Sequence, residues 1–200
     1  WALHPEYEVS DEHQEVTLER IIDVCSAPEM LAVGETGLDY HWCKGDLTWQ
    51  KNRFRRHIEA ALHLKKPIIV HAREAEDDAL AILTEMHAGD AGFVLHCFGG
   101  TTDCALRAVD AGGLVSFTGV VTFKSAAALA ETARVVPLQH LVVETDCPYM
   151  SPVPYRGKRN EPAFVAKVAE KIAAVKDLSF EEVARATTEN ALNFFHLNHA

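Results

Sequence analysis

Four side chains that can bind a divalent metal ion each follow a short apolar run in this sequence. The four are Glu35, His71, His96 and Asp146. An apolar run without polar alternation is typical of a strand that is buried on both faces. Each candidate ligand is therefore expected at the carboxyl end of a parallel strand, which is where α/β enzymes carry their chemistry.

Two imidazoles and two carboxylates form a donor set that suits Zn²⁺, Mn²⁺ or Mg²⁺. A single histidine at a strand end is more often a hydrogen-bonded structural residue, but four such residues at equivalent strand ends favour a shared metal site. A metal in such a site lowers the pKa of bound water and polarises a phosphoryl or carbonyl oxygen. The pattern therefore indicates a metal-dependent hydrolase.

The spacing of these residues predicts the fold that positions them. Consecutive candidates are 36, 25 and 50 residues apart, and one strand and helix of a TIM barrel take roughly 30 residues. The longest interval spans about two such units and contains a further apolar run at residues 113–117. We therefore predict an α/β protein with the TIM (β/α)8 fold, in which this chain supplies five regularly spaced strands.

Helical patterns lie between and after the predicted strands. Apolar residues at i, i+3 and i+4 predict helices around residues 18–25 and 54–62, and further helices are expected at 75–87, 102–111 and 125–135. Pro162 suits a helix start, and Ser179 with Glu182 forms a capping box for a last helix, with a break before Glu189. We find no repeat or linker, so residues 1–200 are interpreted as a single metal-dependent hydrolase domain.

The composition excludes some classes of protein. The net charge of −10 argues against a protein that coats nucleic acid electrostatically, but not against an enzyme that acts on phosphodiesters. No apolar stretch reaches membrane-spanning length, and the start at Trp1 lacks a signal peptide's basic region. The five cysteines form no C-x-x-C pair, which favours a reducing, cytoplasmic location. We expect neither a membrane nor an obligate protein partner.

Five motifs carry a resemblance to a known family. They read GETGLDY at 34–40, VHAR at 70–73, LHCFGG at 95–100, ETDCPY at 144–149 and PYRGKRNEP at 154–162. In this order they resemble the signature motifs of the TatD-like metal-dependent deoxyribonucleases, which are similar to the wider amidohydrolase group. The resemblance implies a TIM barrel with two divalent metal ions (Zn, Mg or Mn) at its carboxyl-terminal mouth, and DNA, or else RNA, as the substrate.

The resemblance also implies roles for the four candidate ligands. Glu35 would be shared between the two metals, and His71 and His96 would bind one of them. Asp146 would bind the other metal and receive a proton from the attacking water. Glu35 and Asp146 are therefore the catalytic candidates.

Three further candidates are predicted to lie near the substrate or the ligands. His4 matches a histidine that the family keeps near the substrate, with a surface or capping role as the alternative. Arg73 is expected on the same face as His71, where it would clamp a phosphate, unless it pairs with a neighbouring carboxylate of residues 74–77. Glu144, which is expected to alternate with Asp146, would orient a ligand or serve the structure alone.

The remaining candidates lie after the last predicted strand. Tyr149 is expected to stack on a base, and Arg156 and Lys158 are expected to hold the nucleic-acid backbone. The alternative for the basic segment 156–159 is a solvated run of charge.

The sequence departs from the family at its start. Family members begin with a strand that carries a His-x-His pair, and no His-x-His occurs in this chain. By the strand count, the chain contains the end of strand three at residues 3–5, strands four to eight and the C-terminal helices. Such a sheet cannot close a barrel, so we interpret the sequence as lacking the first two strands, roughly 60 residues.

The expected function is hydrolysis of phosphodiester bonds in DNA, removing nucleotides from strand ends by water that a two-metal site activates. Two alternatives remain open at this point. One is another amidohydrolase-type enzyme for small esters, amides or phosphotriesters, and the other is an inactive fragment.

Overall fold

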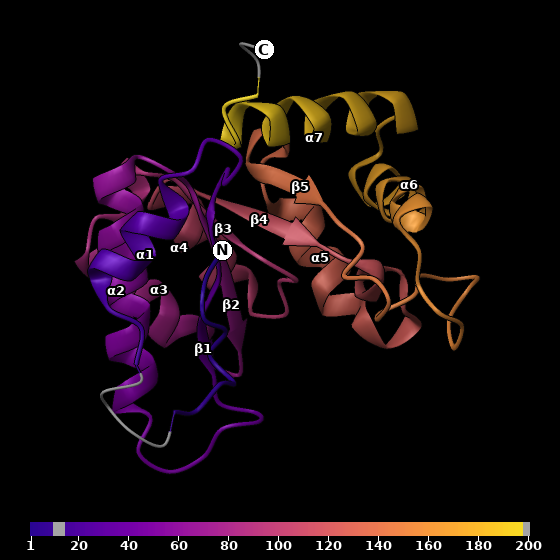
Figure 1. Cartoon of the computed structure of the whole chain (residues 1–200). Coiled ribbons are helices and arrows are strands. Elements are labelled where there is room, and N and C mark those ends of the chain that lie inside the picture. Colours follow the sequence, from indigo (N-terminus) through magenta and orange to yellow (C-terminus); the bar gives the residue numbers. More distant parts are fainter. Residues whose placement is uncertain (10–14, 198–200) are drawn as a thin grey trace. The chain divides into compact units, whose positions relative to one another are not determined.

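The computed structural model describes residues 1–9 and 15–197 (Figure 1). These residues form two compact units: residues 1–96 with 111–113, and residues 97–110 with the chain from 114 onward. Strand order follows chain order, with β1 to β3 in the first unit and β4 to β5 in the second. The prediction of one domain over residues 1–200 stays a prediction.

The first unit contains three parallel strands, β1 (Val33–Asp39), β2 (Ile68–Arg73) and β3 (Phe93–Leu95). All three were predicted from apolar runs, and most of their apolar side chains are buried, whereas Ile69 is half-buried. The carboxyl end of β3 was predicted correctly, because His96 directly follows it. The ends of β1 and β2 were predicted wrongly, because β1 runs on past Glu35 and β2 past His71. The cause is continued backbone pairing, since Gly37 aligns with His71 and Asp39 with Arg73.

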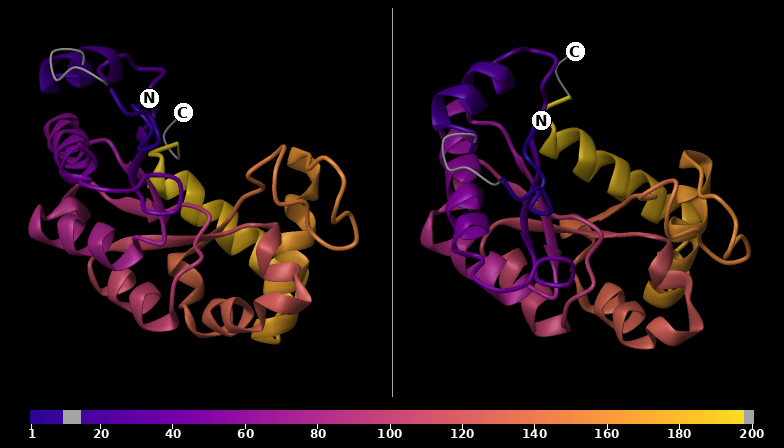
Figure 2. Two further views of the ribbon diagram at one scale, coloured as in Figure 1. Left: turned by 90° about the horizontal axis from the view of Figure 1, so that it is seen from below. Right: turned by 60° about the horizontal axis from the view of Figure 1, so that its bottom comes forward.

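Three helices cover one side of β1 and β2 in the first unit, as Figures 1 and 2 show. They are α1 (Leu18–Cys25), α2 (Thr48–Leu64) and α3 (Glu76–Glu85), followed by the short 3-10 turn η2 (Ala88–Asp90). All three helices were expected from the sequence. Thr17 begins α1 by accepting a hydrogen bond from the backbone N–H of Arg20, which satisfies a donor that the first helical turn leaves open.

The second unit contains β4 (Gly113–Phe117), except for its first residue, and β5 (Leu141–Val143); the two strands pair in parallel. Its helices are α4 (Thr102–Asp110), α5 (Ala127–Val135), α6 (Val165–Lys176) and α7 (Phe180–Phe194). Its 3-10 turns are η3 (Gly119–Thr122), η4 (Lys124–Ala126), η5 (Leu138–His140) and η6 (Pro162–Phe164). None of the helices within the described residues has both the length and the apolar character needed to cross a membrane.

The predicted capping box starts α7, but the predicted break before Glu189 is wrong. Ser179 Oγ accepts from the N–H of Glu182, and the Glu182 carboxylate accepts from the N–H of Ser179. The helix then continues to Phe194 without interruption. Asn190 stabilises this part, because its side-chain amide donates to the carbonyls of Leu138 and Leu141 at 2.8 Å each.

Residues 3–5 were expected to end a strand, and that prediction is wrong, because residues 1–9 contain neither strand nor helix. Trp1 alone follows the strand edge, where its carbonyl accepts from the N–H of Gly34 at 3.2 Å. Beyond Trp1, the backbone bonds to side chains of α2. Gln50 donates to the Pro5 carbonyl at 3.0 Å, and the Leu3 N–H donates to His57 Nε2 at 3.2 Å.

Arg53 makes the central contacts between α2 and this segment. Its guanidinium is buried, with 1% of the side chain exposed, and donates to both carboxylate oxygens of Glu15 at 2.8 and 2.6 Å. It also donates to the carbonyls of His4 and Tyr7 at 3.2 and 2.5 Å. A buried charge requires such partners, so α2 fixes the positions of Glu15 and of residues 1–9, which contain neither helix nor strand.

We expect Arg53→Met to lower the free energy of unfolding by about 3 kcal/mol, because the variant leaves the Glu15 carboxylate buried without its partner. Urea unfolding followed by circular dichroism measures the change. Arg56→Met is the matched control on the same helix. Arg56 is 37% exposed and 3.8 Å from Glu15, so its loss should cost less than about 1 kcal/mol. Equal losses in the two variants would contradict the assigned role.

We also expect stability to fall between pH 6.5 and 4 because of His57. Burial and the nearby Arg53 charge lower the pKa of His57 to about 4, whereas an unfolded histidine titrates near pH 6.5. In this window the unfolded chain takes up the proton and the folded chain does not. The free energy of unfolding therefore drops by up to about 1.4 kcal/mol per pH unit as the pH falls.

Urea midpoints measured between pH 7 and pH 4 test this window. His57→Gln should flatten the pH dependence relative to the unmodified protein. His63→Gln, which changes an exposed histidine of the same helix, should leave it unchanged. A slope that His57→Gln does not alter would rule out this histidine as its source.

Candidate metal centre

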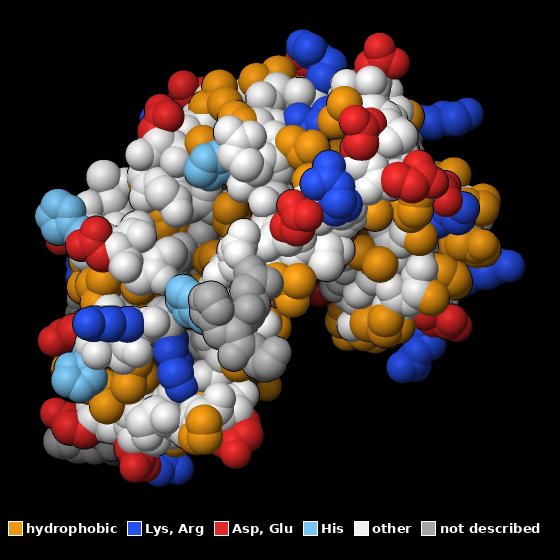
Figure 3. Space-filling view, turned by 90° about the horizontal axis from the view of Figure 1, so that it is seen from above, with side chains coloured by type: hydrophobic (Ala, Val, Ile, Leu, Met, Phe, Trp, Pro, Cys, Tyr) orange, Lys and Arg blue, Asp and Glu red, His pale blue; other side chains and the backbone are white. Residues whose placement is uncertain are grey.

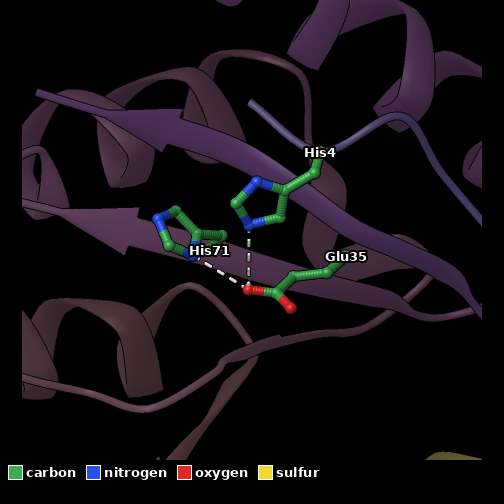
Figure 4. A group of neighbouring side chains, drawn as sticks. All are labelled: His4, Glu35 and His71. Carbon is green, nitrogen blue, oxygen red and sulfur yellow. Dashed lines mark hydrogen bonds and ion pairs between the residues drawn. The ribbon is translucent and has the colours of Figure 1, made fainter. Parts of the chain in front are cut away.

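One carboxylate oxygen in the first unit faces three imidazoles. Glu35 Oε1 lies 2.9 Å from His71 Nδ1, 3.5 Å from His4 Nε2 and 3.5 Å from His96 Nε2. Figure 4 shows His4 and His71 both directed at the Glu35 carboxylate. Donor atoms of His4, Glu35 and His71 all lie within 4.8 Å of one another, a spacing that suits ligands of one metal ion.

Two glycines of β1 bring Glu35 and His71 this close. A Cβ on Gly37 would lie 1.9 Å from the His71 carbonyl oxygen, and a Cβ on Gly34 would lie 2.6 Å from the Ile69 Cβ. Both distances are shorter than any real Cβ contact. The GETG part of the first motif therefore has a steric reason: β1 approaches β2 too closely for side chains at these two positions.

Asp39 fixes the orientation of the His71 ring. It is fully buried, and its Oδ2 lies 2.9 Å from His71 Nε2. A carboxylate that holds one ring nitrogen directs the other toward a metal, and here the other nitrogen, Nδ1, faces Glu35. Our sequence reasoning missed Asp39. The available signal was a carboxylate inside a buried apolar strand, four residues after Glu35.

The electrostatics of the cluster favour a cation. Burial raises the pKa of Glu35, but hydrogen bonds from His4 and His71 and the charges of His96 and His71 outweigh it and hold that pKa far below its usual range. Burial likewise raises the pKa of Asp39, which the Trp42 N–H and His71 lower overall. Burial lowers the pKa of His71, and its two carboxylate partners raise it overall. Ionised carboxylates beside imidazoles fit a divalent ion that replaces the shared protons.

Two further predicted residues, His96 and His4, lie close to Glu35, and His71 also belongs to a second group of possible ligands. His96 directly follows β3 and contributes through its 3.5 Å approach to Glu35. His4, predicted near the substrate, has ligand spacing instead. Glu6, Asp39 and His71 form a second group with ligand spacing, so His71 belongs to both.

Asp146 and Glu144 lie in the second unit, after the end of β5. The predicted alternation of the two residues is wrong, because β5 ends at Val143 and Asp146 has a left-handed backbone with φ of 52°. Glu144 Oε1 accepts from the Cys97 N–H at 2.7 Å, and the Asp146 carbonyl accepts from the Tyr149 N–H at 2.9 Å. The role of Asp146 as a ligand stays a prediction that rests on its motif.

Four predicted substrate-binding residues are exposed: Arg73, Tyr149, Arg156 and Lys158. The Arg73 guanidinium lies over the Trp42 ring, 5.4 Å from its centroid, while Glu74 bonds His41 at 2.6 Å. In the second unit, Tyr149 is 70% exposed, Arg156 lies 4.3 Å from the centroid of the Phe123 ring, and Lys158 is exposed. Their roles toward a substrate stay predictions.

We expect Asp39→Asn to weaken divalent metal binding about 10- to 100-fold. The asparagine amide would donate to His71 Nε2 and place the ring proton on Nδ1, the atom that faces Glu35. Isothermal titration with Mn²⁺ or Zn²⁺ measures the affinity. Asp46→Asn changes an exposed loop carboxylate that bonds Thr48 and should leave it unchanged. An unaltered affinity in Asp39→Asn would show that this carboxylate does not support a ligand.

The comparisons with known proteins agree with this fold and identify a family. The sequence pattern of the family described as TatD related DNase matches residues 1–196. The uncharacterized metal-dependent hydrolase YcfH of Escherichia coli K12 is 47% identical over 84% of this chain, which spans 64% of that protein's length. The 3'-5' ssDNA/RNA exonuclease TatD of Citrobacter rodentium is 32% identical over 97% of the chain and 75% of that protein.

A solved structure supports the fold directly. The crystal structure of the TatD homologue YjjV from Escherichia coli K12 matches with a TM-score of 0.86 and 27% identity, over 98% of this chain and 75% of that one. The expected α/β fold of an incomplete TIM barrel is confirmed. The chain therefore belongs to the TatD-related DNase family.

Proposed function

We propose that the protein hydrolyses phosphodiester bonds of DNA, releasing nucleotides from strand ends. The observation that carries the proposal is the Glu35 carboxylate oxygen facing His4, His71 and His96 in a chain of this family. The relative from Citrobacter rodentium, named as an exonuclease for single-stranded DNA and RNA, supports nucleic acid as the substrate. RNA remains the alternative polymer.

The residues that would hold two divalent ions (Zn, Mg or Mn) are Glu35, His71, His96 and Asp146, with His4 as an additional donor. When bound, the ions supply Lewis-acid chemistry, which lowers the pKa of water and offsets charge on a phosphoryl oxygen. Asp39 keeps His71 oriented throughout. Asp146, assigned by its motif, accepts the proton that the attacking water loses.

Cationic and aromatic side chains would bind the nucleic-acid strand. Arg73 clamps a phosphate, Arg156 and Lys158 bind the backbone, and Tyr149 stacks on a base. Glu144 holds the backbone N–H next to His96 and thereby steadies that ligand.

We also propose a cytoplasmic location. Cys147 is an exposed thiol, and exposed thiols persist in reducing compartments.

A small-molecule hydrolase with the same donor set is the second candidate, because the donors do not themselves define the substrate. The basic segment 156–159 favours nucleic acid over a small ester. Turnover of a single-stranded oligonucleotide compared with that of a p-nitrophenyl ester, at equal enzyme and metal concentrations, separates the two. Preference for the ester would overturn the nuclease proposal.

We expect Asp146→Asn to lower oligonucleotide hydrolysis at least about 1,000-fold, because the amide can neither accept the proton nor supply the same charge to a metal. The measurement is release of mononucleotides from end-labelled DNA with Mg²⁺ or Mn²⁺. Circular dichroism should show an unchanged fold. A chelator should abolish activity in the unmodified protein, and added metal should restore it.

The matched control for this experiment is Asp177→Asn. Asp177 ends α6 with a left-handed backbone, a conformation that asparagine also adopts readily, so activity should be retained. Full turnover by Asp146→Asn in a metal-replete assay would refute the role of Asp146.

A further inference from the structure

Trp42 is a large aromatic side chain that the structure leaves in solvent. It is 62% exposed and follows the end of β1 by three residues, within the first unit. Burying an indole is one of the larger apolar gains in folding. An indole that remains exposed beside a candidate active site therefore indicates a ligand-binding role rather than a role in the core.

The backbone of Trp42 is tied to the candidate metal centre through a single carboxylate. Asp39 Oδ1 accepts from the N–H groups of Trp42 and His41 at 2.6 and 2.9 Å. The other oxygen of the same carboxylate lies 2.9 Å from His71 Nε2. Asp39 is fully buried, so these bonds are shielded from water. The Trp42 backbone is thus held at a fixed position relative to His71.

The neighbours of the indole are also held in place. The Arg73 guanidinium lies 5.4 Å from the centroid of the Trp42 ring, and the Arg73 carbonyl accepts from the Tyr40 N–H at 2.9 Å. The His41 ring meets the indole edge-on at 4.6 Å and is itself bonded to Glu74. The exposed Trp42 ring and the exposed Arg73 guanidinium therefore lie next to each other in fixed positions. Binding a ligand there would cost little side-chain conformational entropy.

We propose that Trp42 and Arg73 form a subsite for one nucleotide of a single strand, in which the base stacks on the indole and the adjacent phosphate pairs with the guanidinium. The inference rests on the proposed function, because it gives the substrate of that same site its point of attachment. Stacking requires an unpaired base, whose face is accessible only outside a duplex. The subsite would therefore select single-stranded ends.

Charge alone does not supply this affinity. The chain carries a net charge of −10, and on the face drawn in Figure 3 the Lys and Arg side chains are interspersed with Asp and Glu. A polyanion gains little from such a surface. A stacking contact does not depend on net charge. It can therefore bind the nucleic-acid strand even though the negative net charge of the protein repels it.

The test is binding of short single-stranded DNA to the intact, chelator-treated protein, measured by fluorescence anisotropy. A strand of equal length and charge in which every nucleotide lacks its base is the comparison ligand. Trp42→Ala should weaken binding of the normal strand about tenfold or more and leave binding of the abasic strand unchanged. Trp42→Phe, which keeps an aromatic face, should retain most of the affinity. Arg73→Gln should weaken both strands by the same factor.

Phe180→Ala is the matched control, since Phe180 is an exposed aromatic residue of the second unit, 39% exposed, and should not affect either strand. Equal affinities for the normal strand in Trp42→Ala and the unmodified protein would overturn the subsite. Equal losses for the two strands would also overturn it. Hydrolysis is measured separately with metal, so a protein that binds bases through Trp42 without cleaving DNA would refute the proposed function and leave the subsite standing.

Discussion

The buried charge of Arg53 is the constraint on which the first unit depends. Water cannot reach this guanidinium, so Glu15 and the carbonyls of His4 and Tyr7 must replace its hydration. His4 and Tyr7 lie in residues 1–9, which contain neither helix nor strand, and Glu15 also lies outside any helix or strand. One helix side chain therefore determines where an irregular segment presents its imidazole to Glu35.

A second constraint acts between β1 and β2, where buried carboxylates organise the polar groups. Glu35 and Asp39 approach His71 at its two ring nitrogens, so the imidazole has one orientation available. Asp39 also binds the backbone of His41 and Trp42. The candidate ligands and the exposed loop that carries His41 and Trp42 are therefore parts of one hydrogen-bond network. A substitution that moves the loop backbone would also shift Asp39 and, through it, the His71 ring.

Apolar runs and helical periodicity were enough to predict the strands and the helices. They also predicted the meeting of Glu35, His71 and His96, because these residues lie within or directly after three neighbouring parallel strands. The errors share a physical origin. β1 extends to Asp39 through pairing with β2, residues 3–5 are held by α2 rather than by a strand, and α7 is continued by Asn190. Each depends on a partner far away in the sequence, which no local pattern contains. Asp39 was overlooked although its position near the end of β1, four residues after Glu35, was a signal in the sequence.

The close approach of β1 to β2 at Gly37 determines which amino-acid substitutions would alter the geometry of the site. The separation of Glu35 from His71 is set by contact between two backbones, with the Gly37 Cα against the His71 carbonyl. Replacing either ligand would alter the donor chemistry but not this separation. A single methyl group at position 37, on the other hand, would force the strands apart and leave both ligands chemically intact. The distance between the Glu35 and His71 donor atoms therefore depends on Gly37, a residue that has no side chain and is not itself a candidate ligand.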